Sequence, residues 1–307
     1  MTTPTHAPTR TASAPVPAGE TARATTAGPA PRSGRLAVPG AELYYEVRGS
    51  GPVLLIAQSG EGDAGRSVDL VDRLVERYTV ITYDRRGLSR SVLADPRAAL
   101  GPAVHAEDAH HLLAALTDGP VAVLGLSIGA VIGLHLALRH PEQVHTLIAH
   151  EPVAPALLPA AARDHHRGEL LELRELYERE GLAAACRETA KVLGIDPGST
   201  DREAGLTEHP VDARRVANFH LFFTRELAGI AADPLTAEQV RGLRGGPVRI
   251  VPVAGRTTPS EVFDYRCAEE LAALLGTAPA EFPGGHNGNL AHPAAYAARL
   301  REVLDRI

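Results

Sequence analysis

The sequence predicts an α/β protein with a mainly parallel sheet covered by helices on both faces. From about residue 35 onward, short continuous apolar runs alternate with stretches of helical length. Strands that alternate with helices in this way form parallel sheets with helices on both sides. The composition agrees, because 44% of the 307 residues are apolar, which is enough for one large core with an inserted segment or for two small domains.

Residues 1–33 differ in composition from the rest of the chain. They are dominated by Thr, Ala and Pro, and their only large apolar side chains are Met1 and Val16. Such a segment buries too little surface to offset the entropy of ordering, so we expect a disordered tail. A secretory signal would need an apolar stretch of about 7–15 residues, which this segment lacks.

Charge and cysteine content exclude several classes of partner. The net charge is −6 and there is no basic stripe, so we expect no nucleic-acid partner. No apolar run reaches the roughly 18 residues that cross a bilayer, so no membrane partner is expected. Cys186 and Cys267 lie far apart without metal-ligand spacing. This predicts reduced thiols, no metal and a cytoplasmic location.

The first part of the predicted core runs to residue 151. Residues 43–47 resemble an early antiparallel strand, and the continuous apolar run 52–57 predicts a buried strand. The next predicted strand is 78–83, and residues 103–116 have a helical pattern. A helix between these two strands would bury one side, formed by Val68, Leu70, Val71, Leu74 and Val75.

The run 121–124 is short, β-branched and bounded by Gly119-Pro120, which predicts another buried strand. A helix follows at 130–138 and stops before Pro141. The remaining core elements are predicted as strands at 144–150, 248–253 and 278–282, and as helices at 261–275 and 294–304.

The alternation of strands and helices stops at residues 152–246. This segment is helical by composition, and we predict that it forms a cap over the strand ends, inserted between core segments 34–151 and 247–307. It holds three of the five phenylalanines, Phe219, Phe222 and Phe223. They either pack the cap against the core or line an apolar pocket, together with Gln58 and Ser59 from the core.

The motif Gly125-Leu126-Ser127-Ile128-Gly129 directly follows the predicted strand 121–124. A serine between two glycines at a strand-to-helix junction is typical of a nucleophile elbow, in which the tight turn pushes the serine out above the sheet. Its hydroxyl then lies at the positive end of a helix, where a developing anion is stabilised. We predict that Ser127 is a nucleophile; the alternative is a serine that caps the helix.

A serine nucleophile needs a base that removes its proton and an acid that orients this base. The predicted base is His286, which follows the last predicted strand in the glycine-rich loop 283–288. Such a loop allows an imidazole to reach a neighbouring strand end. The alternative is a loop histidine without a role, since the chain has 14 histidines.

The acid has more than one candidate. The loop after strand 248–253 is its usual place, but this loop has no aspartate where one is expected. Glu261 and Asp264 come later, at a predicted helix start, where acidic residues are favoured by the helix dipole alone. Glu151 ends strand 144–150, at the edge of the sheet where ligand sites gather. We predict Glu151 as the acid, with Glu261 and Asp264 as alternatives.

The reaction also needs hydrogen-bond donors for an oxyanion. One donor is expected from the backbone N–H of Ile128, directly after the nucleophile, and the second from the loop 58–62 after an earlier strand. Gly60 is the expected donor of that loop by its position. The alternative is an ordinary glycine turn before a helix.

Together these residues resemble the α/β-hydrolase superfamily over about residues 35–307. The matching pieces, in the order of the family, are residues 125–129, Tyr83-Asp84-Arg85-Arg86-Gly87-Leu88-Ser89-Arg90-Ser91, and Gly284-Gly285-His286. The resemblance implies an eight-stranded sheet, a cap after the sixth strand and Ser–acid–His catalysis without a cofactor. It also implies that the Asp-Arg-Arg-Gly turn braces the sheet.

The spacing from Ser127 to Glu151 looks like that of family members with their acid after the sixth strand, such as haloalkane dehalogenases. The chain departs from the family at Gln58-Ser59, where most members have His-Gly. Dehalogenases and epoxide hydrolases of this fold use an aspartate nucleophile, so a serine suits acyl transfer to water.

The predicted function is therefore hydrolysis of an ester, lactone or thioester of a largely apolar small molecule through an acyl-enzyme. The alternatives are an acyltransferase, a cyclase or a C–C bond-cleaving enzyme on the same scaffold, and a ligand-binding protein without catalysis. The expected partner is a small-molecule substrate, and a homodimer is left open.

Overall fold

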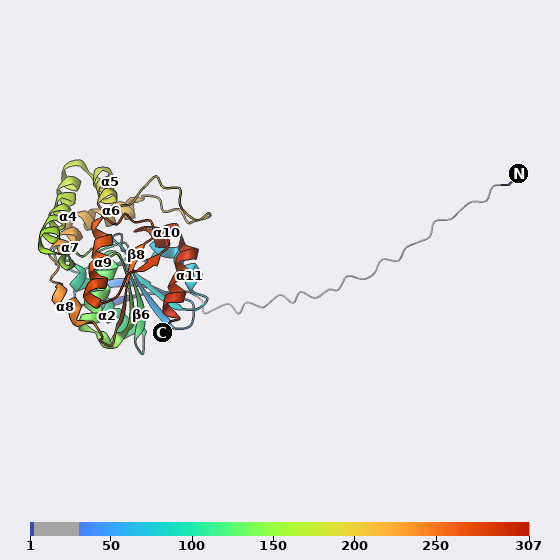
Figure 1. Ribbon diagram of the computed structural model, residues 1–307, viewed down its shortest axis with the longest axis horizontal. Coiled ribbons are helices and arrows are strands. Elements are labelled where there is room, and N and C mark those ends of the chain that lie inside the picture. The colour runs from blue at the N-terminus through green and yellow to red at the C-terminus, as the bar shows by residue number, and fades with distance from the viewer. Residues whose placement is uncertain (3–30, 307) are drawn as a thin grey trace.

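The structure is a computed structural model that describes residues 1–2 and 31–306, and it has one sheet between two layers of helices (Figure 1). Most of the predicted tail, residues 3–30, lies outside the described residues. Its predicted end is too late, because Arg32 and Ser33 already belong to the first strand. That strand is held by backbone pairing with residues 41–47, which needs no apolar side chains.

Within the described residues the sheet has nine strands. Eight follow the order β1-β2-β4-β3-β6-β7-β8-β9, and the two-residue strand β5 pairs with β2 off this path. β2 is antiparallel to its neighbours, and the strands from β4 to β9 along this path are parallel. The strands are β1 (Arg32–Val38), β2 (Ala41–Arg48), β3 (Val53–Ala57), β4 (Thr79–Tyr83), β5 (Val92–Leu93), β6 (Val121–Leu126), β7 (Val144–His150), β8 (Arg249–Gly255) and β9 (Ala280–Phe282).

Alternate residues of the central strands point to opposite faces and enter two separate cores. In β3, Leu55 belongs to one core, and Leu54 and Ile56 belong to the other. The first core is covered by α2 (Pro102–Leu116), α3 (Ile128–Arg139) and α9 (Phe263–Leu275), and the second by α1 (Val68–Leu74) and α11 (Pro293–Leu304). The short helix α10 (Gly288–Ala291) packs against α1 and α11. The continuous apolar runs of the strands therefore reflect burial on both faces.

The segment between β7 and β8 is helical. In Figure 1 its helices α4, α5 and α6 lie together beyond one end of the sheet. Its elements are α4 (Ala160–Glu180), α5 (Leu182–Val192), α6 (Ala213–Leu221), the π-helical turn η4 (Phe222–Glu226), α7 (Leu227–Ala231) and α8 (Ala237–Gly242). Helix α8 falls in the predicted cap range but packs against α3 and α9 of the core. None of the helices in the described part of the chain is long and apolar enough to span a membrane.

Candidate active site

Ser127 occupies a strained turn between β6 and α3. Its φ is 59°, and its N–H donates to the carbonyl of His150 at 2.9 Å. The flanking glycines are required by space: a Cβ on Gly125 would lie 2.5 Å from the Gly129 carbonyl oxygen, and one on Gly129 would lie 2.0 Å from that of Ala57. A positive φ on a residue other than glycine costs energy and is concentrated at functional sites. The turn therefore fixes the serine at the end of β6.

His286 lies in the loop after β9, and its side chain is 3% exposed. Its Nδ1 is 2.9 Å from Glu151 Oε2, in hydrogen-bond geometry, and 2.6 Å from Asp264 Oδ2. Glu151 directly follows β7 and has a positive φ of 40°, while Asp264 lies in the first turn of α9. The structure thus brings two of the three acid candidates to one ring nitrogen, whereas Glu261 lies on an exposed turn.

Both carboxyl groups and the imidazole influence one another's pKa. Burial alone would raise the pKa of Glu151, but the hydrogen bond from His286 lowers it well below its usual range. Burial also raises the pKa of Asp264, and the charge of Glu151 raises it further, against the opposing effect of His286. Burial would lower the pKa of His286, but the two carboxyl groups raise it. Of the two carboxyl groups, Glu151 therefore keeps its charge down to the lower pH.

An apolar cavity of about 230 Å³ opens onto Ser127 and His286. We call it the apolar cavity. The predicted oxyanion residues Ile128 and Gly60 also line it, and so do Ser59 and the three phenylalanines Phe219, Phe222 and Phe223. Among the described residues no hydrogen bond joins the Ser127 hydroxyl to the imidazole; such bonds are often long before substrate binds.

Gln58 does not line this cavity, and its prediction as a pocket residue is wrong. Its side chain is buried and accepts a hydrogen bond from Ser67 Oγ at 2.8 Å. Asn289 Nδ2 donates to the same hydroxyl at 3.2 Å. The Gln58 side-chain oxygen is therefore directed to Ser67, which does not line the apolar cavity.

Arg85 holds the loop that carries the predicted oxyanion donor. Its Nη1 donates to the carbonyls of Gln58 at 3.0 Å and Ser59 at 2.6 Å, and its Nη2 donates to Gly60 at 2.8 Å. The same fully buried guanidinium pairs with Glu226 of the π-helical turn at 2.7 Å. One side chain therefore fixes the loop 58–60 and connects it to the helical segment between β7 and β8.

Glu226 in turn lies 3.0 Å from His105 Nε2 of α2. Burial alone would raise the pKa of Glu226, but the Arg85 charge and the His105 contact lower it to about 2. Sequence reasoning missed this role of Arg85 and Glu226. The only signal was the pair of adjacent arginines, Arg85-Arg86, directly after a buried strand.

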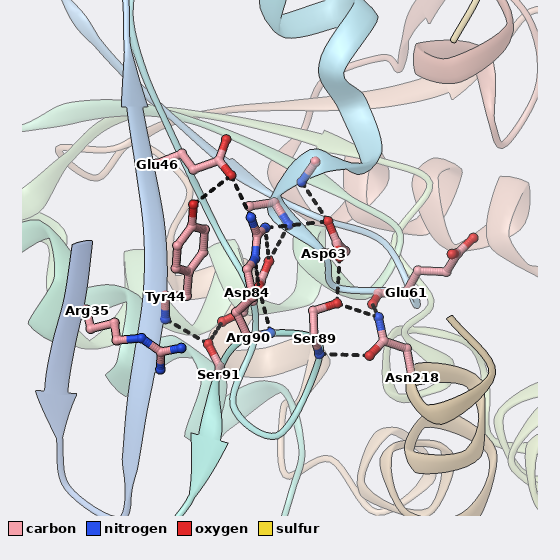
Figure 2. A network of polar contacts seen from close by, with 12 residues as sticks. Arg35, Tyr44, Glu46, Glu61, Asp63, Asp84, Ser89, Arg90, Ser91 and Asn218 are labelled. Atoms are coloured by element: carbon pink, nitrogen blue, oxygen red, sulfur yellow. Dashed lines mark hydrogen bonds and ion pairs between the residues drawn. The ribbon is translucent and has the colours of Figure 1, made fainter. Parts of the chain in front are cut away.

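A second polar network connects helix α6 to the core near residues 61–63 (Figure 2). Asn218 accepts from the Ser89 N–H at 2.8 Å and donates to the Ser89 hydroxyl at 2.7 Å. That hydroxyl donates to Asp63. Arg215, also on α6, forms a bidentate ion pair with Glu61, next to Gly60. Asn218 and Arg215 therefore connect α6 to Ser89 and Glu61, and through Ser89 to Asp63.

Two groups of described residues have the donor types of a metal site, Glu151–Asp264–His286 and His165–His166–Glu169. In the first group the ring Nδ1 donates to Glu151, and in the second His166 and Glu169 form an ion pair on α4. Each group therefore contains one hydrogen-bonded pair of a histidine and a carboxyl group, and the first group is suited to proton transfer.

Comparisons with known proteins agree on one family. The family described as "alpha/beta hydrolase fold" matches residues 52–222. A protein of Bacillus subtilis (strain 168), "Uncharacterized hydrolase YraK", is 39% identical over 276 residues, which is 89% of this chain and 96% of that protein.

Two solved structures are similar in fold. A thermophilic esterase from Thermogutta terrifontis matches with a TM-score of 0.66 and 20% identity over 90% of this chain and 98% of that one. A Pseudomonas aeruginosa protein provisionally assigned as an epoxide hydrolase matches with a TM-score of 0.66 and 22% identity over 91% and 96% of the two chains. At these identities the likeness concerns the fold.

Proposed function

Because this chain belongs to the α/β-hydrolase family, we propose that it is a serine hydrolase that cleaves an ester, lactone or thioester through an acyl-enzyme. The observation that carries the proposal is the shared cavity of Ser127 and His286, with Glu151 hydrogen-bonded to the far side of the imidazole. The strained φ of Ser127 is consistent with this role, because such strain persists where the surrounding structure enforces it.

The proposed reaction begins when Ser127 Oγ attacks the substrate carbonyl and its proton passes to His286 Nε2. Glu151 keeps the ring proton on Nδ1, so Nε2 is free to accept, and its charge stabilises the imidazolium that forms. The N–H groups of Ile128 and Gly60 donate to the oxyanion, and loss of one such donor typically costs about 10²–10³-fold in rate. His286 then returns the proton to the leaving oxygen or sulfur.

Hydrolysis of the acyl-enzyme reverses these roles. A water molecule gives a proton to His286 Nε2 and attacks the acyl carbon, and the serine oxygen leaves and regains its proton from the imidazolium. A serine at residue 127 favours acyl chemistry over epoxide opening, although one similar fold is assigned provisionally to epoxide hydrolysis. The esterase neighbour is compatible with this choice.

The test is a pair of serine variants assayed on short p-nitrophenyl esters. Ser127→Ala should keep the fold, as seen by circular dichroism, and lose turnover and labelling by a fluorophosphonate probe. Ser50→Ala, on the exposed turn between β2 and β3, is the matched control and should retain both. Turnover that survives in Ser127→Ala would reject the acyl-enzyme mechanism.

A further inference from the structure

Two cavities of different character meet at His286. Beside the apolar cavity lies a larger cleft of about 720 Å³, and the two share His286, Asn287 and Ile195 in their walls. We call the larger one the polar cleft. Ser127, Ile128 and Gly60 line the apolar cavity but not the polar cleft.

The polar cleft has walls that are fixed to the core. One wall is the segment 193–212, which has little regular structure. Thr207 donates from its N–H and its hydroxyl to Asp69 of the α1 helix, at 2.9 and 2.8 Å. Glu203 accepts from the N–H groups of Ala294 and Ala295 at the start of α11, both at 2.9 Å. A long irregular segment held in this way is commonly a binding element.

The charges that line the polar cleft are mixed, with an excess of carboxylates. Its walls hold two arginines and four acidic residues, so their net charge is −2 when the histidines are neutral. These residues are Arg66, Arg202, Asp69, Asp196, Asp201 and Glu208. Hydroxyl and amide groups of Ser67, Thr207 and Asn289 add further donors and acceptors. Such a surface suits a neutral polar group or a cation better than an anion.

The chemistry assigns the two ends of a substrate to the two cavities. The acyl carbon is bonded to Ser127 and its oxygen faces Ile128 and Gly60, so the acyl chain must lie in the cavity that these residues line. The leaving oxygen takes its proton from His286. His286 lines both cavities, and the acyl chain occupies the apolar one, so the leaving oxygen departs toward the polar cleft.

We propose that the polar cleft is the leaving-group site of this enzyme, and that it takes an alcohol that is polyhydroxylated or cationic, while the apolar cavity takes the acyl chain. This inference rests on the proposed serine hydrolase function. After the first step the alcohol leaves with the proton from His286, and water then enters through the same cleft and gives its proton to Nε2. A cleft with many polar groups admits this water.

The experiment compares four hexanoate esters by pH-stat titration of the released acid. The leaving alcohols are glycerol (neutral and polar), choline (cationic), pentanol (apolar) and glycolate (anionic). We expect kcat/KM for the glycerol and choline esters to exceed that for the pentyl ester by about tenfold or more, which corresponds to about one good hydrogen bond or ion pair. The glycolate ester should be the poorest of the four.

A double variant tests whether the cleft itself makes this choice. Asp201→Lys with Glu208→Lys changes two exposed residues of the cleft and reverses its net charge. Relative to the pentyl ester, it should improve the glycolate ester and weaken the choline ester, each by several-fold. Glu172→Lys with Glu175→Lys on the exposed side of α4 makes the same change of total charge outside the cleft and should alter none of these ratios.

The outcomes separate this inference from the proposed function. If the pentyl ester is hydrolysed as well as the glycerol ester, or if both double variants shift all esters equally, the leaving-group site is refuted and the serine hydrolase stands. If none of the esters is hydrolysed and a fluorophosphonate fails to label Ser127, the proposed function itself fails. If the glycolate ester is the best substrate of the wild type, the assignment of charge is wrong.

Discussion

Replacement of Glu151 by glutamine tests which carboxyl group serves His286. Glu151 Oε1 accepts from the Gly255 N–H at 2.7 Å, and Oε2 accepts from His286 Nδ1 at 2.9 Å. A glutamine has one acceptor oxygen, so if it keeps the bond to Gly255 its amide NH₂ faces the imidazole. A donor opposite Nδ1 favours the tautomer with the proton on Nε2, and that nitrogen can then no longer accept the serine proton.

The expected loss of kcat in Glu151→Gln lies between two limits. A hydrogen bond to a charged group contributes about 1.5–3 kcal/mol, which corresponds to about 10- to 150-fold in rate. The wrong tautomer in a serine protease triad costs about 10⁴-fold. Here Asp264 Oδ2 lies 2.6 Å from the same nitrogen and offers a second acceptor. We therefore expect kcat to fall by about 10³-fold, below the full protease value.

Asp264→Asn is the matched variant, because asparagine has the same size as aspartate and residue 264 is buried like residue 151. It should change the plateau kcat by less than about tenfold. It should also shift the acid limb of the kcat/KM profile to lower pH, because removal of a negative charge beside Nδ1 lowers the pKa of His286. Steady-state kinetics across pH, with circular dichroism to confirm folding, distinguishes the two. If Asp264→Asn loses about 10³-fold and Glu151→Gln does not, the acid is Asp264.

Three further predictions concern the loop, the cavity and acid stability. Arg85→Lys removes the fork that holds the loop 58–60, so kcat should fall by about 10²-fold with little change in KM; a change in KM alone would contradict this. The apolar cavity of about 230 Å³ holds about eight water-sized groups. The kcat/KM of p-nitrophenyl esters should therefore rise with acyl length up to about the octanoate and then fall. Phe219→Ala should move this fall to longer chains. The lowered pKa of Glu226, from 4.5 to about 2, contributes about 3 kcal/mol of stability that is present above about pH 4.5 and lost as the pH falls toward 2. Urea unfolding should show this loss in the wild type, and Glu226→Gln, although less stable at neutral pH, should lack that part of the pH dependence.

The sequence predicted the central strands because burial on both faces leaves a continuous apolar run, as in residues 52–57 and 121–124. It did not predict β1 and β5. These strands lie beside the antiparallel strand β2, and β1 includes Arg32, Ser33 and Arg35 with exposed or half-buried side chains. Strands of this kind are held by backbone hydrogen bonds, which leave no side-chain pattern.

The local pattern around Ser127 was predictable because the turn itself demands glycine at two fixed positions. The choice of acid was not predictable in the same way. Glu151 follows a strand and Asp264 begins a helix, and each position has an ordinary structural explanation. Only the tertiary fold brings both within hydrogen-bond distance of one nitrogen. Glu226 gave no signal at all, because its partner Arg85 is far away in the sequence.

The contacts of the helical segment between β7 and β8, which is the predicted cap, suggest how substrate reaches the site. Glu226 cannot leave Arg85 without leaving a buried charge unpaired, and breakage of a buried ion pair costs about 3–5 kcal/mol. At this free-energy cost, the state in which the ion pair is broken would be populated at about 1% or less. The same movement would release the loop 58–60 and disturb the proposed oxyanion donor. A hinge of the whole cap therefore conflicts with a formed site, whereas the polar cleft reaches His286 without it. We expect substrate to enter, and alcohol to leave, through the polar cleft while the cap stays closed.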